Sequence, residues 1–260
     1  MKKKTLNLFI EIVAFLAVLL GGYVVYDYYD SETIKIANWN LQVFGQTKAN
    51  NLGLMQIYSE VIEEYDIIFV QEIRDSSQMA FPKLCSMLQN YSCISSSRAG
   101  RTSSKEQYGL IYREGINLID FKDYNPDSQE RWERPPIKII FDAEGYYFTV
   151  YNIHVKPEDV QKELNYLEDI VSETGNVLIL GDLNADCFYY NNEEQIEFDD
   201  WNWLIKDDED TTSSNSDCAY DRIILNDDAY EEYAHDGIYK KGITTDVSDH
   251  YLVWVEIKVN

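Results

Sequence analysis

Short apolar runs bounded by polar residues are the feature that most limits what this chain can fold into. The continuous runs at residues 67–70 and 177–180 are typical of strands buried on both faces. Residues 146–155 and 221–225 have a similar pattern, and apolar and polar residues alternate from 253 to 259. The sequence therefore predicts buried strands spread over most of the chain.

Helical patterns lie between these strands. Pro157 suits a first helical position, and apolar residues then recur at helical spacing towards Gly175. Residues 55–64 form a second candidate helix, with Ile57 and Val61 facing inward. Because strands and helices mix without strict alternation, the pattern predicts an α/β fold of two packed mixed sheets with helices outside.

The net charge of −24 first argues against a nucleic-acid ligand, because proteins that bind phosphates usually carry a basic face. The acidic residues either keep the chain soluble or hold divalent cations that mediate contact with a polyanion. Charge alone leaves both interpretations open, so the motifs have to decide between them.

The first thirty residues have the layout of an export or membrane segment. Lysines at positions 2–4 precede an apolar stretch from residue 8 to 26, which only Glu11 interrupts. This layout predicts an uncleaved membrane anchor or a cleaved signal peptide, with a buried core helix as a further alternative. In the first two cases residues 31–260 form one extracytoplasmic domain, either anchored or secreted.

Four cysteines agree with export: Cys85, Cys93, Cys187 and Cys218. An even number in an exported chain predicts two disulfides. Pairing of sequence neighbours would join Cys85 to Cys93 and Cys187 to Cys218. The alternative is four buried free thiols.

Residues able to do chemistry flank the strand-like runs. They are Asn40, Glu72, His154, Asp182 with Asn184, and Asp249 with His250. Because loops at strand ends converge on a rigid scaffold, separate strands can bring these residues together.

Each of these motifs also has a structural interpretation. A buried Glu72 needs a cation or donors, so it indicates either a metal or an ion pair. Asp182 and Asn184 face one way in an extended segment and can grip a hard cation, unless they form an Asx turn. Asp249 beside His250 can join a metal ligand to a general base or form a surface pair, and a lone His154 is more often a core residue.

The order and spacing of the motifs, from about residue 34 to 258, resemble the endonuclease/exonuclease/phosphatase superfamily. The matching segments are residues 36–40, 65–75, 100–108, 181–187, 210–223 and 248–251. Residues 100–108 and 210–223 resemble the deoxyribonuclease I branch in particular. The resemblance implies a four-layer α/β sandwich, in which two packed mixed β-sheets are flanked by helices and the catalytic cleft lies at one end.

The resemblance also implies a metal-dependent endonuclease that hydrolyses DNA phosphodiester bonds with a water activated by histidine. The catalytic residues it implies are His154, His250, Glu106, Asp221, Asn184 and Asp182. The ligands it implies for Mg²⁺ or Mn²⁺ are Asn40, Glu72, Asp249 and Asp182. Glu106 would orient His154, and Asp221 would orient His250, which is taken as the base.

Further residues match the family outside this centre. Arg74, Arg101 and Arg134 correspond to arginines that contact DNA, with ordinary surface charge as the alternative. A structural Ca²⁺ loop is implied at Asp210, Thr212, Ser214 and Ser216. Cys187 and Cys218 correspond to the larger disulfide of the family. The expected partner is double-stranded DNA, bound by a monomer.

Departures from the family pattern at Gln42 and Ser104 weaken the case for strong duplex binding. Gln42 replaces an arginine, Ser104 replaces a tyrosine that enters the groove, and residues 124–131 replace a small disulfide loop. The rival function is a phosphodiesterase or phosphatase that acts on a lipid or other small phosphate ester at a membrane. The N-terminal segment favours this rival, and the segments 100–108 and 210–223 oppose it. A binding module without activity is disfavoured, because a candidate exists for every catalytic role.

Overall fold

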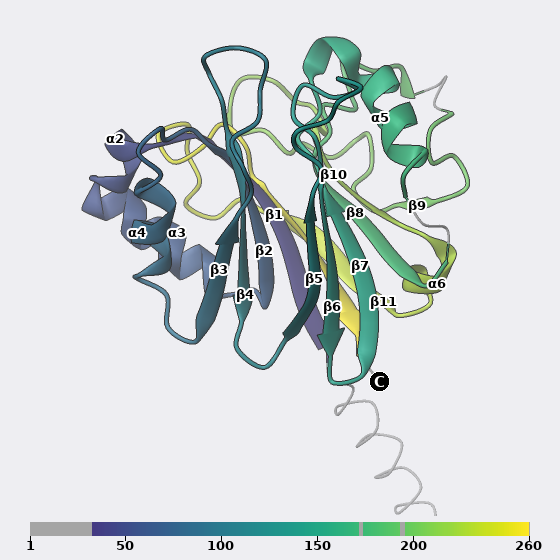
Figure 1. Cartoon of the computed structure of the whole chain (residues 1–260), viewed down its shortest axis with the longest axis horizontal. Coiled ribbons are helices and arrows are strands. Elements are labelled where there is room, and N and C mark those ends of the chain that lie inside the picture. Colours follow the sequence, from purple (N-terminus) through teal and green to yellow (C-terminus); the bar gives the residue numbers. More distant parts are fainter. Residues whose placement is uncertain (1–32, 172–173, 193–195, 260) are drawn as a thin grey trace, which may run out of the picture.

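The computed structural model describes residues 33–171, 174–192 and 196–259 (Figure 1). The N-terminal segment predicted at residues 1–30 lies outside these ranges. Within the described residues, no helix has the length and apolar character needed to cross a membrane.

The first sheet has six strands in the order β11-β12-β1-β2-β4-β3. Their bounds are β1 Thr33–Phe44, β2 Ile67–Ile73, β3 Tyr91–Ser95, β4 Gln107–Arg113, β11 Tyr233–Tyr239 and β12 Leu252–Lys258. Only the β1–β2 pair is parallel, so this sheet is mixed, as predicted.

The second sheet also has six strands, in the order β5-β6-β7-β8-β10-β9. Their bounds are β5 Asn117–Asp123, β6 Ile137–Ala143, β7 Tyr146–Asn152, β8 Asn176–Asp182, β9 Asn202–Trp203 and β10 Asp221–Leu225. Here β7 and β8 are the parallel pair. The core strands β8 and β10 are almost continuously apolar and buried, as their sequence runs predicted.

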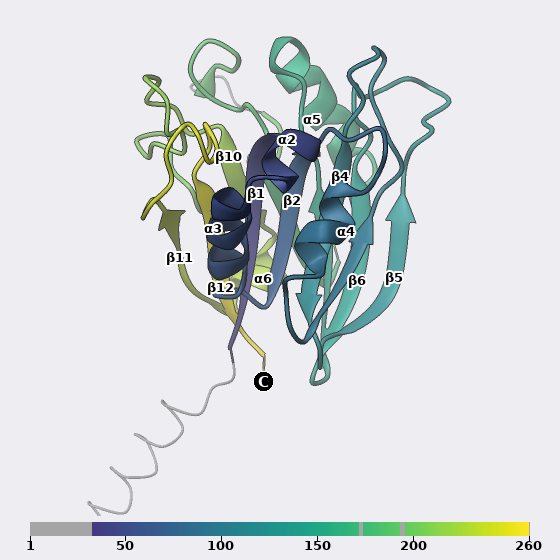
Figure 2. The ribbon, with the colours of Figure 1, turned by 90° about the vertical axis from the view of Figure 1, so that its left-hand side faces the viewer.

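Helices cover the outer faces of the two sheets, which completes the predicted four-layer sandwich. α2 (Gln46–Ala49), α3 (Leu52–Ile62) and α4 (Ala80–Cys85) lie on the first sheet, and Figure 2 shows them in front of β1 and β2. The 3-10 turn η1 (Pro157–Asp159) and α5 (Val160–Glu168) lie on the second sheet. A short helix, α6 (Asp227–Tyr230), follows β10. The central apolar layer between the sheets includes Phe69, Leu110, Phe141, Val150 and Leu180.

Local chemistry sets the ends of the two predicted helices. α3 begins three residues before the predicted start, because the Asn51 side chain accepts hydrogen bonds from the N–H groups of Gly53 and Leu54. α5 ends well before Gly175. The chain turns there, and the Ile170 carbonyl accepts a hydrogen bond of 3.1 Å from the Tyr151 hydroxyl.

The strand directions gather the candidate catalytic residues at one pole, where the upper loops of Figure 1 lie. β1, β2, β7 and β8 end there, whereas β10 and β12 begin there. β1 continues past Asn40, so this residue lies inside a strand and not in a loop that follows one. The register of β1 on β2 shifts between Asn40 and Phe44, where Gln42 and Val43 adopt positive φ values of 46° and 53°.

Three buried amide side chains join the two sheets beneath this pole. Gln71 on β2 donates to the carbonyl of Ile153 at 2.9 Å and accepts from the N–H of Asp182 at 2.9 Å. Asn152 on β7 donates to the side chain of Asn38 on β1 at 2.8 Å. The two sheets are thus fixed to each other by polar contacts directly below the candidate catalytic residues.

Candidate active site

His154 follows β7 and is held by a buried carboxylate. Its Nδ1 atom lies 2.6 Å from Oε1 of Glu106, a residue just before β4. Its backbone N–H donates to the Tyr108 hydroxyl at 3.0 Å. The imidazole is 5% exposed and Glu106 is 3% exposed. A carboxylate on Nδ1 fixes the ring and leaves Nε2 as the atom that faces the site.

Two arginines form ion pairs with the Glu106 carboxylate. Arg74 Nε lies 3.1 Å from one carboxylate oxygen, and Arg134 Nε lies 3.1 Å from the other. Burial raises the pKa of Glu106, but His154, Arg134 and Arg74 outweigh burial and lower this pKa to about 2. Glu106 therefore remains an anion and cannot act as the proton donor at neutral pH.

His250 precedes β12 and repeats the arrangement from the opposite side. Its Nδ1 lies 2.7 Å from Oδ2 of Asp221, which is fully buried at the start of β10. Burial lowers the pKa of His250, but Asp221 and Asp182 outweigh burial and raise this pKa to about 10. Burial raises the pKa of Asp221 to about 6, against the attraction of His250. The imidazole is thus cationic as long as the surrounding carboxylates keep their charge.

Both imidazoles point at one carboxylate oxygen. Oδ2 of Asp182, at the end of β8, lies 3.3 Å from Nε2 of His154 and 3.6 Å from Nε2 of His250. The same oxygen accepts a hydrogen bond of 3.0 Å from Asn40 Nδ2. Asn184, at φ 50°, donates through its backbone N–H to the other oxygen at 3.2 Å. The predicted catalytic residues therefore form one compact group.

Oxygen donors for a hard cation surround this group. Ligand atoms of Glu72, Glu106 and His154 lie within 4.8 Å of one another. Burial lowers the pKa of Lys48, and the nearby carboxylates of Asp249 and Glu72 only partly oppose this. Both carboxylates therefore act on the same ammonium group. Asp249 Oδ1 also lies 3.9 Å from Nε2 of His250. Carboxylate and amide oxygens suit Mg²⁺ or Mn²⁺, so the donor set fits such an ion.

Comparison with known proteins gives this arrangement a family. The sequence profile of the Endonuclease/Exonuclease/phosphatase family matches residues 37–250. The chain belongs to that family. Deoxyribonuclease-1 of Gallus gallus is 31% identical over 87% of this chain and 93% of its own length. Deoxyribonuclease-1 of Homo sapiens is 32% identical over 81% and 80%, and deoxyribonuclease gamma of Rattus norvegicus is 31% identical over 74% and 71%.

Solved structures of this endonuclease/exonuclease/phosphatase fold agree with the architecture. A humanized TDP2 of D. rerio superposes with a TM-score of 0.67 at 14% identity, covering 87% of this chain and 99% of its own. A family member from Bacteroides vulgatus has a TM-score of 0.64 at 19% identity, covering 88% and 100%. At such low identity these likenesses show the fold alone.

The three arginines predicted to contact DNA differ in their surroundings. Arg134 has a side chain only 12% exposed, and it donates to the His154 carbonyl at 2.9 Å, so it supports the centre from inside. Arg74 bridges Glu106 and Glu72 and is 28% exposed. Arg101 is 45% exposed and contacts Glu133 and nearby carbonyls.

The residues expected to form a Ca²⁺ loop do come together. Asp210 Oδ1 accepts from the Thr212 hydroxyl at 2.8 Å, and this hydroxyl also accepts from Ser216 Oγ at 3.0 Å. Ser214 and Ser216 share a hydrogen bond of 2.7 Å. The loop lies beside the centre, because Thr212 forms a β-bridge with His250.

Both predicted disulfides are confirmed. Cys85 pairs with Cys93 and Cys187 pairs with Cys218, and the described residues contain no free cysteine. Asp186 lies beside the second pair, but sulfurs already joined in a disulfide are not free to bind a metal.

Residues that sequence reasoning missed are mainly the supports of the centre. The amides of Asn38, Gln71 and Asn152 carry no charge and occur in strands, so nothing in their spacing distinguished them. Ser248 is another such support. Its hydroxyl donates to the Asn40 carbonyl at 2.6 Å and accepts from the His250 N–H at 3.1 Å, so it links a metal-ligand candidate to a histidine.

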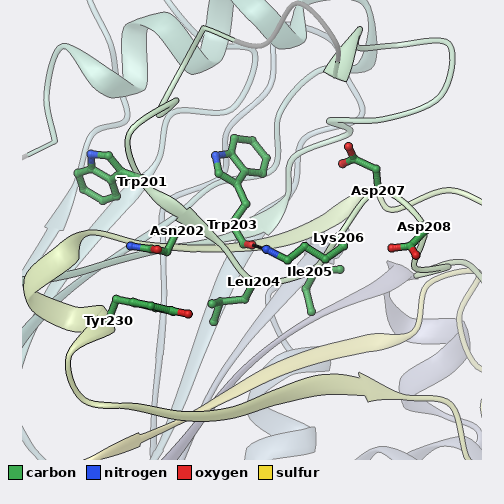
Figure 3. A pocket seen from close by; sticks show the side chains of 9 residues that line it. All are labelled: Trp201, Asn202, Trp203, Leu204, Ile205, Lys206, Asp207, Asp208 and Tyr230. Carbon is green, nitrogen blue, oxygen red and sulfur yellow. Dashed lines mark hydrogen bonds between the residues drawn. The ribbon is translucent and has the colours of Figure 1, made fainter.

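A large hollow of about 540 Å³ lies away from this centre, along β9 and α6 (Figure 3). Trp201, Trp203 and Tyr230 line it, together with Lys206 and Asp207. It contains no histidine and none of the predicted site residues. The hollow is therefore separate from the catalytic centre, which His154, His250 and Asp182 define.

Proposed function

We propose that this chain is a metal-dependent endonuclease that hydrolyses phosphodiester bonds of DNA, double-stranded DNA included. The observation that supports this most strongly is the pair of imidazoles, each fixed by a buried carboxylate and both directed at Asp182 Oδ2. Such a pair can take a proton from water on one side of a phosphate and give a proton to the leaving oxygen on the other. The similarity to deoxyribonuclease-1 supports DNA as the substrate.

We assign the divalent ion to Asn40, Glu72, Asp182 and Asp249, whose oxygen donors fit Mg²⁺ or Mn²⁺. When bound, the ion supplies positive charge that stabilises the phosphate as negative charge develops in the transition state. Asn184 lies beside Asp182 and helps to stabilise the negative charge that develops on the phosphate oxygens.

The two histidines then have opposite roles. Nε2 of His250 accepts a proton from the attacking water, whose oxygen bonds to phosphorus. His250 has to be neutral to accept this proton, whereas Asp221 and Asp182 raise the pKa of its imidazole to about 10. A cation held by Asp182 and Asp249 would lower that pKa again. His154, oriented by Glu106, gives a proton to the 3′-oxygen as its bond to phosphorus breaks.

Peripheral residues have supporting roles in this proposal. Arg74 and Arg101 contact the DNA backbone, and Arg134 acts mainly on Glu106. Asp210, Thr212, Ser214 and Ser216 hold a structural Ca²⁺. The protein works as a monomer outside the cytoplasm, where its disulfides are stable. Residues 31–260 form the nuclease domain, and residues 1–30 act as the export signal or membrane anchor.

Nicking of supercoiled plasmid tests this proposal, with RNA and sphingomyelin as parallel substrates. We expect plasmid nicking in Mg²⁺, faster nicking when Ca²⁺ is also present, and none in excess EDTA. Full activity in excess EDTA would refute the metal mechanism. Hydrolysis of the lipid with no cleavage of any DNA would instead assign the site to a membrane phosphate ester.

A further inference from the structure

Two ring contacts lead from the catalytic His250 to Tyr220 and then to Tyr189, and Phe188 is the neighbour of Tyr189 in the chain. We call Phe188, Tyr189 and Tyr220 the aromatic strip. Phe188 is completely exposed, at 101%, and Tyr189 is 44% exposed. The ring centroids of Tyr189 and Tyr220 are 5.6 Å apart, and those of Tyr220 and His250 are 6.5 Å apart. The strip therefore begins at a catalytic imidazole and ends in solvent.

The backbone beneath the strip is held in place. Phe188 and Tyr189 lie in the loop after β8, and Tyr220 lies just before β10. The Cys187–Cys218 disulfide joins these two loops. The Leu183 N–H donates to the Tyr220 carbonyl at 2.9 Å, and the Ala219 N–H donates to the Asp186 carboxylate at 2.7 Å. The exposure of Phe188 thus belongs to an anchored loop.

The position of the strip points to what it binds. Exposed aromatic rings bind nucleic acid by stacking on bases, and this contact tolerates any sequence because every base has a flat π-face. The rings here are tilted by 40° and 42° to their neighbours, so no ring is covered face to face by the next. A phosphate held between the two histidines would have its neighbouring nucleotide beside Tyr220.

Charge favours stacking over backbone contact here. Asp186 and Asp217 lie beside the strip, and the Asp186 carboxylate already accepts hydrogen bonds from the Ala219 N–H and from Asn192. Carboxylates repel phosphates but leave stacking unaffected. A base in a closed duplex is covered by its neighbours on both faces, so only an unpaired or frayed base can lie on the strip.

We propose that Phe188, Tyr189 and Tyr220 bind an unpaired nucleotide next to the scissile phosphate, so that this enzyme cuts duplex DNA where the helix opens. This inference rests on the proposed function. The same preference predicts that negatively supercoiled plasmid is cut faster than the same plasmid in relaxed form, because negative supercoiling promotes local melting.

The test compares two duplexes of equal length, one fully paired and one with a central unpaired bubble, cut by the full chain in Mg²⁺. We expect the wild-type protein to cut the bubble faster. Phe188→Ala and Tyr189→Ala should each lower kcat/KM on the bubble by at least about 5-fold, mostly through KM, since base stacking on an aromatic residue is worth at least this factor. Phe188 is wholly exposed, so its replacement does not disturb packing.

Tyr230→Ala is the matched control. Tyr230 is also 44% exposed and stacks on Tyr233 at 5.3 Å, but it lines the remote hollow of Figure 3. The Tyr230→Ala variant should cut both duplexes with the kcat/KM of the wild type. Equal wild-type rates on the two duplexes, or equal losses on both in the strip variants, would overturn the inference while leaving the nuclease intact. A wild-type protein that cuts neither duplex would refute the proposed function itself.

Discussion

Replacing Gln71 by methionine tests whether buried amides fix the two sheets to each other. Methionine nearly preserves the volume of glutamine but makes no strong hydrogen bond. The two short contacts of Gln71, both 2.9 Å, satisfy the backbone N–H of Asp182 and the carbonyl of Ile153. Its longer contacts, at 3.3 and 3.4 Å, reach Asn152 and Asn38. All of these groups are buried, so water cannot replace the lost partner.

The two short contacts set the expected size of the effect. Leaving a buried backbone group unpaired costs about 1–3 kcal/mol, so two such groups cost about 4 kcal/mol in the free energy of unfolding. In a domain of this size 1 kcal/mol lowers Tm by about 2–4 °C, which gives a fall of roughly 8–16 °C. Nicking should fall as well, because Asp182 loses the contact that fixes its backbone.

Urea and thermal unfolding would measure this effect, with Gln161→Met as the matched control on the exposed face of α5. The control should match the wild type within about 0.5 kcal/mol, as surface substitutions usually do. A Gln71→Met protein within about 1 kcal/mol of the wild type would show that these amides do not hold the sheets together. The reasoning about the support of the centre would then be wrong.

Three further predictions concern the centre and its surroundings. His154→Ala and His250→Ala should each slow plasmid nicking by at least about 100-fold in protein that still folds, and near-normal rates in either folded variant would remove that histidine from the mechanism. The pKa of Glu106 is lowered from 4.5 to about 2, so its stabilisation is complete above about pH 4.5 and is lost as the pH falls towards 2. Urea unfolding in EDTA should show a loss of about 3 kcal/mol over that interval, which Glu106→Gln should reduce. Replacing Cys187 and Cys218 together by serine should lower stability by about 4 kcal/mol, given their separation of 31 residues; an unchanged urea midpoint would contradict this.

The sequence predicts the chemistry of the centre better than its supports. Asp182, His154 and His250 were expected because the order and spacing of their motifs resemble the family, although each motif alone also had a structural interpretation. The structure brings both imidazoles within 3.6 Å of one Asp182 oxygen. Gln71 and Asn152 were not predicted as supports, because neutral amides in strands leave no periodic signal. Their importance depends on contacts between two sheets that are distant in sequence.

The edge strands and the orientation of long side chains could not be predicted from the sequence either. β5 at residues 117–123 is mostly exposed and lacks the apolar pattern of a core strand, and β9 has only two residues. The sequence predicted that Arg134 contacts DNA or lies on the surface, yet its guanidinium turns inward to Glu106. Such a choice depends on which buried carboxylate is within reach, and this is a property of the assembled fold.

The chain enters the fold at the pole opposite to its chemistry. Thr33 pairs with Lys258 at the far end of β1, seven residues before Asn40, so about 23 Å separate the first strand residue from the centre. A short tether ahead of Thr33 that attaches the domain to a lipid bilayer or to a solid support would place the pole opposite the catalytic centre next to that surface. The catalytic centre would then face the surrounding solution, where DNA can reach it. It would face away from the phospholipid head groups of the bilayer to which the domain is attached.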